Sequence, residues 1–126
     1  MREITKDLIK NFHLKKYDFM GYHLVRNQCT YHHIVKKCNN GEMSIENGAP
    51  LMPLNHQYLH IIESYEHYMY EFINKVFINI HNRGEILTSD YRLISDVLHE
   101  FEEIYKNDRT SKGKILIKRE LFKRDF

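Results

Sequence analysis

One stretch near the middle of the chain changes its residue preferences three times, and each change limits the fold. Residues 30–35 are rich in β-branched and aromatic side chains, which predicts a strand, and residues 36–47 hold several turn-forming Asn and Gly residues. A second strand is expected over residues 49–54, where two prolines indicate a short or edge strand. Apolar residues then recur at helical spacing over residues 55–81, with Asn55 as the expected N-cap. The pattern predicts a β-hairpin followed by a long helix.

Further helices are expected on both sides of this unit. Apolar residues at helical spacing predict a short N-terminal helix that ends near Phe12, and residues 22–25 have strand-forming side chains. A C-terminal helix is expected over residues 89–106, while residues 114–122 fit a strand or a helix equally. No repeat or linker divides the 126 residues, so we expect one α+β domain with a helical C-terminal extension.

The composition is that of an ordinary soluble protein and excludes several classes. Hydrophobic residues make up 42% of the chain, yet no apolar run approaches the roughly 20 residues needed to span a bilayer. The N-terminal segment lacks the apolar core of a secretory signal. Cys29 and Cys38 form neither a CxxC pair nor a disulfide framework. We therefore expect a cytoplasmic protein without a membrane anchor or a cysteine-based zinc site.

The net charge of +2 hides an uneven distribution along the chain. Residues 1–40 hold eight Lys/Arg against three Asp/Glu, residues 41–105 hold three against eleven, and the basic tail of residues 106–126 again holds eight against three. Basic ends around an acidic middle suit a polyanionic partner, for which DNA is the expected choice. The candidates for phosphate contact are Lys36, Lys37, Lys112, Lys114, Lys118, Arg119, Lys123 and Arg124.

Four histidines and one asparagine in the central stretch carry the chemistry. His56 and His60 lie one helical turn apart, a spacing that lets two imidazoles share one ion, and His32 can add a third nitrogen from the strand. Three protein ligands with open positions are typical of a catalytic metal site. Imidazole ligands favour Zn²⁺, Ni²⁺, Co²⁺ or Mn²⁺, while Mg²⁺ remains open because water and phosphate would complete its shell.

The remaining imidazole belongs to His33, which is available as a general base at neutral pH. Neighbouring strand residues point to opposite faces, so His32 and His33 can serve one cleft only if the strand ends, twists or bulges there. Asn47, at the far end of the loop, is expected to set that geometry by bonding to the opposing backbone. Glu63 is expected to accept the second N–H of a ligand imidazole.

The segment over residues 29–63 resembles the HNH endonucleases, whose fold is the ββα-metal or His-Me finger. Three pieces carry the resemblance: residues 31–35 (YHHIV), 46–51 (ENGAPL) and 56–60 (HQYLH). His33, Asn47 and His56 match the residues that give the family its name, and His60 matches an additional ligand in an all-histidine version similar to the DNase colicins. Many members brace this motif with paired CxxC zinc ligands, which this chain lacks.

The resemblance implies a metal-dependent DNA endonuclease that leaves 5′-phosphate and 3′-hydroxyl ends. In that reading His33 is the general base, Asn47 fixes the loop, and His32, His56 and His60 bind one divalent ion (Mg²⁺, Mn²⁺, Ni²⁺ or Zn²⁺). Two alternatives stay open. One is a non-catalytic nucleic-acid-binding module with a structural metal, although a scaffold has no need of a spare base. The other is a metallohydrolase that acts on RNA or other phosphoesters.

Overall fold

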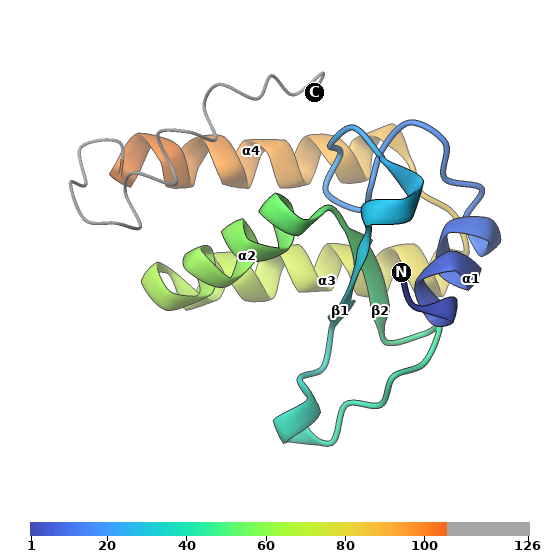
Figure 1. The fold of residues 1–126 in the computed structure, drawn as a ribbon. Helices are drawn as coiled ribbons and strands as arrows, with labels where there is room; N and C mark the ends of the chain where they lie inside the picture. The colour runs from blue at the N-terminus through green and yellow to red at the C-terminus, as the bar shows by residue number, and fades with distance from the viewer. Residues whose placement is uncertain (106–126) are drawn as a thin grey trace.

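The computed structural model describes residues 1–105, which form a two-stranded antiparallel hairpin and four α-helices, an α+β arrangement as expected (Figure 1). The basic tail and the segment 114–122 lie outside the described residues. The elements are α1 (Glu3–Asn11), η1 (Arg26–Gln28), β1 (Thr30–His33), η2 (Lys37–Asn39), β2 (Gly48–Leu51), α2 (Pro53–Tyr65), α3 (His67–Arg83) and α4 (Thr88–Tyr105).

The hairpin confirms the predicted order of strand, loop and strand, but both strands are shorter than predicted: β1 ends at His33 instead of residue 35, and β2 at Leu51 instead of residue 54. β1 and β2 pair from Thr30 opposite Leu51 to His33 opposite Gly48. β2 ends at Leu51 because Pro53 occupies the first turn of α2, where its missing N–H costs nothing. The expected N-cap was therefore wrong: Met52 precedes α2, and Asn55 lies inside its first turn.

The single long helix predicted over residues 55–81 is also wrong, because Glu66 divides it into α2 and α3. Glu66 has an extended backbone (φ −138°, ψ 83°), and its carboxylate accepts a hydrogen bond from the hydroxyl of Tyr105 at the end of α4. The buried residues Ile62 and Met69 flank the break seven positions apart, so the apolar pattern keeps its helical phase across it. The contact that accompanies the break is thus distant in sequence.

Residues 22–25 do not form the predicted strand. Tyr17 and His23 make an isolated bridge, and the loop between them folds around the buried carboxylate of Asp18. This carboxylate accepts hydrogen bonds from the backbone N–H groups of Met20 (2.9 Å) and Tyr22 (3.1 Å). Backbone N–H groups that strand pairing would require are thus hydrogen-bonded within the loop itself.

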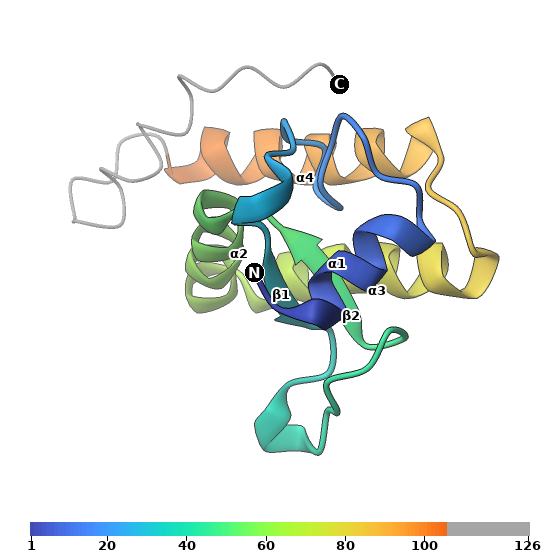
Figure 2. The same cartoon turned by 45° about the vertical axis from the view of Figure 1, so that its right-hand side comes forward.

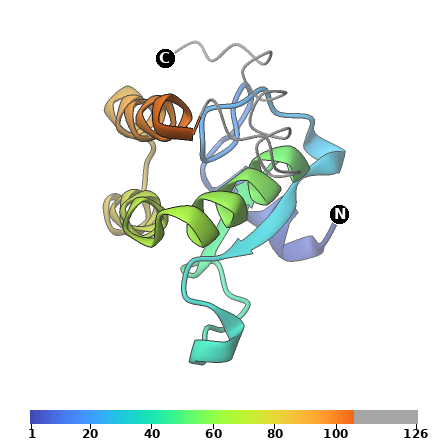
Figure 3. The ribbon, with the colours of Figure 1, turned by 90° about the vertical axis from the view of Figure 1, so that its left-hand side faces the viewer.

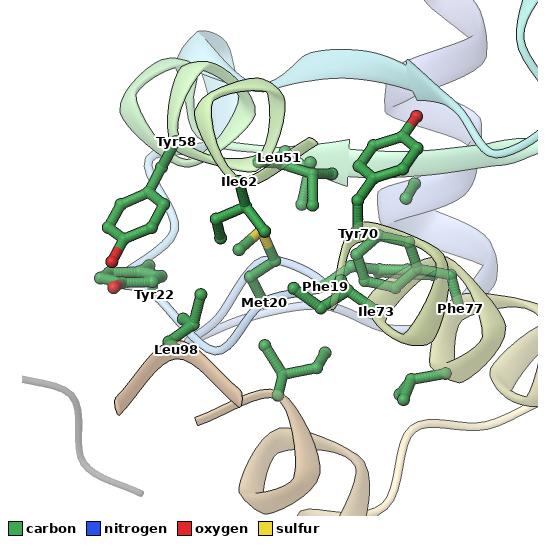
Figure 4. Packing of buried hydrophobic residues seen from close by; sticks show 14 of the residues in the cluster. Phe19, Met20, Tyr22, Leu51, Tyr58, Ile62, Tyr70, Ile73, Phe77 and Leu98 are labelled. Atoms are coloured by element: carbon green, nitrogen blue, oxygen red, sulfur yellow. The ribbon is translucent and has the colours of Figure 1, made fainter. Parts of the chain in front are cut away.

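The hairpin lies between α1 on one side and α2 on the other, while α3 packs against both α2 and α4 (Figures 1 and 2). Figure 3 shows α3 and α4 nearly end-on, with the loop between β1 and β2 extending away from the helices. Phe19 and Met20 from the first loop are fully buried together with side chains of α2, α3 and α4 (Figure 4). This shared core fixes α2 beside β1.

Candidate metal centre

The three predicted ligand histidines lie together where β1 meets α2. One ring nitrogen each from His32, His56 and His60 lies within 4.8 Å of the others. The ring centroids of His56 and His60 are 5.0 Å apart, and that of His32 is 5.4 Å from His56. His32 is 1% exposed, whereas His60 is open to solvent. The cluster therefore has a buried floor and an accessible rim, and it could hold one metal ion.

The His32 ring is held by a side chain from α3. Its Nε2 atom lies 2.8 Å from Oδ1 of Asn74, and both residues are buried. Because an amide oxygen can only accept, Nε2 carries the proton and Nδ1 of His32 keeps its lone pair. A metal ligand needs such a lone pair, so this contact sets the tautomer required for coordination.

The two helical histidines are oriented in the same manner by different partners. Nδ1 of His56 lies 2.8 Å from Oγ1 of Thr30, whose own proton is donated to the carbonyl of Leu51 at 2.9 Å. Nδ1 of His60 lies 3.1 Å from Oε1 of Glu63, a carboxylate that can only accept. Both rings therefore donate through Nδ1 and keep the lone pair on Nε2. In each of the three imidazoles, one ring nitrogen thus donates its N–H to an acceptor, and the other ring nitrogen keeps its lone pair.

Burial keeps the deeper ligands neutral. It lowers the pKa of His32 to about 3, although the contact with Asn74 acts in the other direction. Burial and the neighbouring charge of His60 lower the pKa of His56 to about 4. A protonated imidazole cannot bind a metal, so these two rings are available as ligands at neutral pH without first losing a proton.

Glu63 links the cluster to the loop that follows β1. Its Oε2 atom pairs with Nζ of Lys36, and its Oε1 atom accepts from His60. Burial alone would raise the pKa of Glu63, but the hydrogen bonds from Lys36 and His60 outweigh it and lower the pKa. The ammonium of Lys36 also lies 5.7 Å from the centre of the Tyr70 ring. Lys36, predicted as a phosphate contact, thus stands beside the cluster as the partner of Glu63.

Asn47 braces the two ends of the long hairpin loop. Its Oδ1 atom accepts from the N–H of Val35 at 2.7 Å, and its Nδ2 atom donates to the carbonyls of Val35 (3.0 Å) and Glu42 (2.9 Å). The backbone carbonyl of Asn47 also accepts from the N–H of Ile34 at 2.9 Å. The side chain therefore closes the loop directly after His33, as expected from its place in the sequence.

His33 is the last residue of β1 and is partly exposed beside this braced loop. Its ring packs edge-on against Tyr31, on the same strand face, with centroids 4.8 Å apart. The charge of His33 nevertheless lowers the pKa of both His32 and His56, so its ring lies within electrostatic range of the cluster. Burial, Lys37 and Arg2 lower the pKa of His33 itself. His33 thus lies on the strand face opposite His32, and a neutral imidazole at this strand end can accept a proton.

No protein-family model, curated protein or solved structure matches the chain. The assignment of its chemistry therefore depends on the geometry of the cluster. Within residues 1–105, no helix is both long and apolar enough to cross a bilayer.

The sequence did not predict Asn74 and Thr30 as the hydrogen-bond partners of His32 and His56. Asn74 lies on a different helix, and no spacing rule connects it to His32. Thr30 stands two residues before His32, but its role depends on the pairing with Leu51 that brings it beside α2. Outside the cluster, His81 has a structural role, because its Nε2 atom donates to the carbonyl of Gly48 at 2.7 Å. The predicted phosphate contacts in the tail lie outside the described residues: Lys112, Lys114, Lys118, Arg119, Lys123 and Arg124.

Proposed function

We propose that this protein is a metal-dependent endonuclease that hydrolyses phosphodiester bonds in DNA, and that β1, β2 and α2 form its ββα-metal core. One observation carries the proposal. The three clustered imidazoles each donate one N–H to an acceptor and so keep the other nitrogen free. Metal-binding histidines usually have such an acceptor, which fixes the tautomer and the orientation of the ring.

The donor set fits a catalytic ion better than a structural one. His32, His56 and His60 supply three nitrogen ligands and leave at least one position for water or phosphate. The exposed edge at His60 gives a substrate access to that position. Imidazole ligands favour Zn²⁺, Ni²⁺ or Mn²⁺, and Mg²⁺ is accommodated if phosphate and water complete its shell. Such an ion would stabilise the negative charge that develops on the phosphate and the leaving oxygen.

His33 is the proposed general base. Its lowered pKa keeps the ring unprotonated at neutral pH, so it can take a proton from the attacking water. Its position depends on the strand end, which Asn47 fixes through its bonds to Val35. Lys36 and Lys37 follow directly on the loop and are the proposed contacts to the neighbouring backbone phosphates.

Plasmid nicking tests this proposal directly. Supercoiled plasmid is incubated with the protein and Mg²⁺, Mn²⁺, Ni²⁺ or Zn²⁺, with EDTA as the control for metal dependence. We expect wild type to nick with at least one ion, and His33→Ala to lose activity by about 100-fold or more while it still binds metal. The matched control is His67→Ala, which removes an exposed imidazole from α3 and should nick as wild type does.

The same assay separates the alternatives. Duplex binding without nicking in any of the four ions would indicate a metal-stabilised binding module. Cleavage of RNA or of a small phosphodiester, with intact plasmid, would indicate a different metallohydrolase. Equal nicking by His33→Ala and wild type would remove His33 from the role of base.

A further inference from the structure

A basic pocket, separate from the histidine cluster, lies between α1 and the short helix η1. A pocket of about 300 Å³ opens there. Three cationic side chains line it, together with one amide and two apolar residues: Lys6, Lys10, Arg26, Asn27, Met1 and Ile9. No carboxylate is among the lining residues. A hollow of this size, in which every charged lining residue is positive, suits a phosphate group better than a neutral ligand.

The lining on α1 follows from its helical spacing. Arg2 precedes the helix, and Lys6 and Lys10 follow at intervals of four residues, so the three cations lie along one side. Leu8 and Ile9 are buried against the rest of the protein, which fixes this basic side toward η1. Lys6 also pairs with exposed Glu3 at 3.5 Å, a weak surface contact that a phosphate can replace.

Arg2 connects this basic side to the strand end that carries His33. Its guanidinium lies 3.1 Å from the sulfur of Met43, in the loop between the strands. Its charge also contributes, with that of Lys37, to the lowered pKa of His33. Arg2 therefore extends the positive charge of Lys6 and Lys10 from α1, which lies at the front in Figure 2, toward the loop between the strands.

We propose that the pocket between α1 and η1 binds a backbone phosphate of the DNA strand on one side of the bond that is cut. The inference rests on the proposed nuclease function and names a part of its substrate contact. Lys10 and Arg26 would contact the phosphate oxygens, and the Asn27 amide could donate a further hydrogen bond. Contacts of this kind hold the backbone in register and read no base sequence.

Duplex binding at several salt concentrations tests the pocket. The affinity of a short fluorescent duplex is measured by anisotropy in EDTA, which prevents cleavage, for wild type and for Lys10→Gln/Arg26→Gln. We expect the affinity to fall about tenfold for each of the two cations that is removed. The slope of log affinity against log salt should fall by about one for each cation. The matched control is Lys75→Gln/Arg92→Gln, which removes the same charge from exposed sites on α3 and α4.

The outcomes separate this inference from the proposed function. Equal losses of affinity in the two double variants would mean that net charge, and not the pocket, governs affinity. Plasmid nicking by wild type, together with unchanged affinity in the pocket variant, would overturn the pocket and leave the nuclease intact. Pocket-dependent binding without nicking by wild type would keep the phosphate site and overturn the nuclease. Circular dichroism melting of all variants shows that each one is folded.

Discussion

The Nε2 atom of His32 lies 2.8 Å from Oδ1 of Asn74, a contact that joins β1 to α3 inside the core. The contact is buried at both ends, so it fixes the ring more firmly than a surface contact would. It also determines which nitrogen of His32 remains free. The histidine cluster thus depends on three elements of the fold, β1, α2 and α3, although its three histidines come from only β1 and α2.

We expect Asn74→Leu to weaken metal binding by about 10- to 100-fold, because the buried ring of His32 loses the acceptor that fixes its tautomer. Isothermal titration calorimetry with Ni²⁺ or Zn²⁺ measures the change. Asn74→Asp keeps an acceptor at this position and should retain more affinity than the leucine variant. Asn79→Leu, on an exposed part of the same helix, is the control. Equal affinity in Asn74→Leu and wild type would show that the contact does not orient a ligand.

The two deeper imidazoles of the cluster, His32 and His56, predict how stability depends on pH in the absence of metal. In the folded protein the pKa values of His32 and His56 are about 3 and about 4, below the value of about 6.5 for an unperturbed histidine. The unfolded chain therefore binds more protons. The stability that these groups contribute is complete above about pH 6.5 and is lost as the pH falls toward about 3.

Urea unfolding in EDTA at pH 7 and pH 5 measures this effect. We expect wild type to be less stable at pH 5, and His56→Ala to show a smaller difference between the two pH values. His67→Ala, which removes an exposed imidazole, should keep the wild-type difference. An undiminished difference in His56→Ala would show that this ring is already solvated in the folded state.

The sequence predicted the cluster because its ligands lie on consecutive elements. The spacing of His56 and His60 depends only on the helical turn. His32 lies near them because the hairpin returns β2 alongside β1, and α2 follows directly after β2. These relationships are local. Asn47 was predictable for the same reason, since it stands where the loop re-enters the hairpin.

The features that the sequence did not predict depend on distant contacts. Nothing near Glu66 breaks a helix, and the contact that accompanies its extended backbone comes from Tyr105 on α4. Asp18 has the sequence surroundings of an ordinary loop residue, yet its carboxylate is fully buried and accepts from Met52 and Asn55 as well as from its own loop. A carboxylate in a loop can either accept hydrogen bonds from the protein or remain in solvent. Which of the two occurs depends on tertiary packing that the local sequence does not specify.

Asp18→Asn should destabilise the protein by roughly 2–4 kcal/mol, because an amide group replaces a charged acceptor that faces four N–H donors. The donors include the backbone N–H of Met52, the residue directly before α2, so the helix that carries His56 should fray first. Urea unfolding with wild type in parallel gives the free energy. Asp96→Asn, on an exposed part of α4, should change it by less than about 0.5 kcal/mol. Similar values for the two variants would mean that the Asp18 carboxylate is not a required acceptor.

Asn47→Ala should separate metal binding from catalysis. The side chain holds the loop through Val35 and Glu42 and touches none of the three ligands, so metal affinity should stay near that of wild type. The end of β1 loses its brace, and a small displacement of His33 should lower the nicking rate by about 100-fold. Calorimetry and plasmid nicking on the same preparation measure the two effects. Asn39→Ala, at an exposed position in the same loop, is the control and should nick normally. A parallel loss of metal affinity and rate in Asn47→Ala would instead show that the loop supports the ligands themselves.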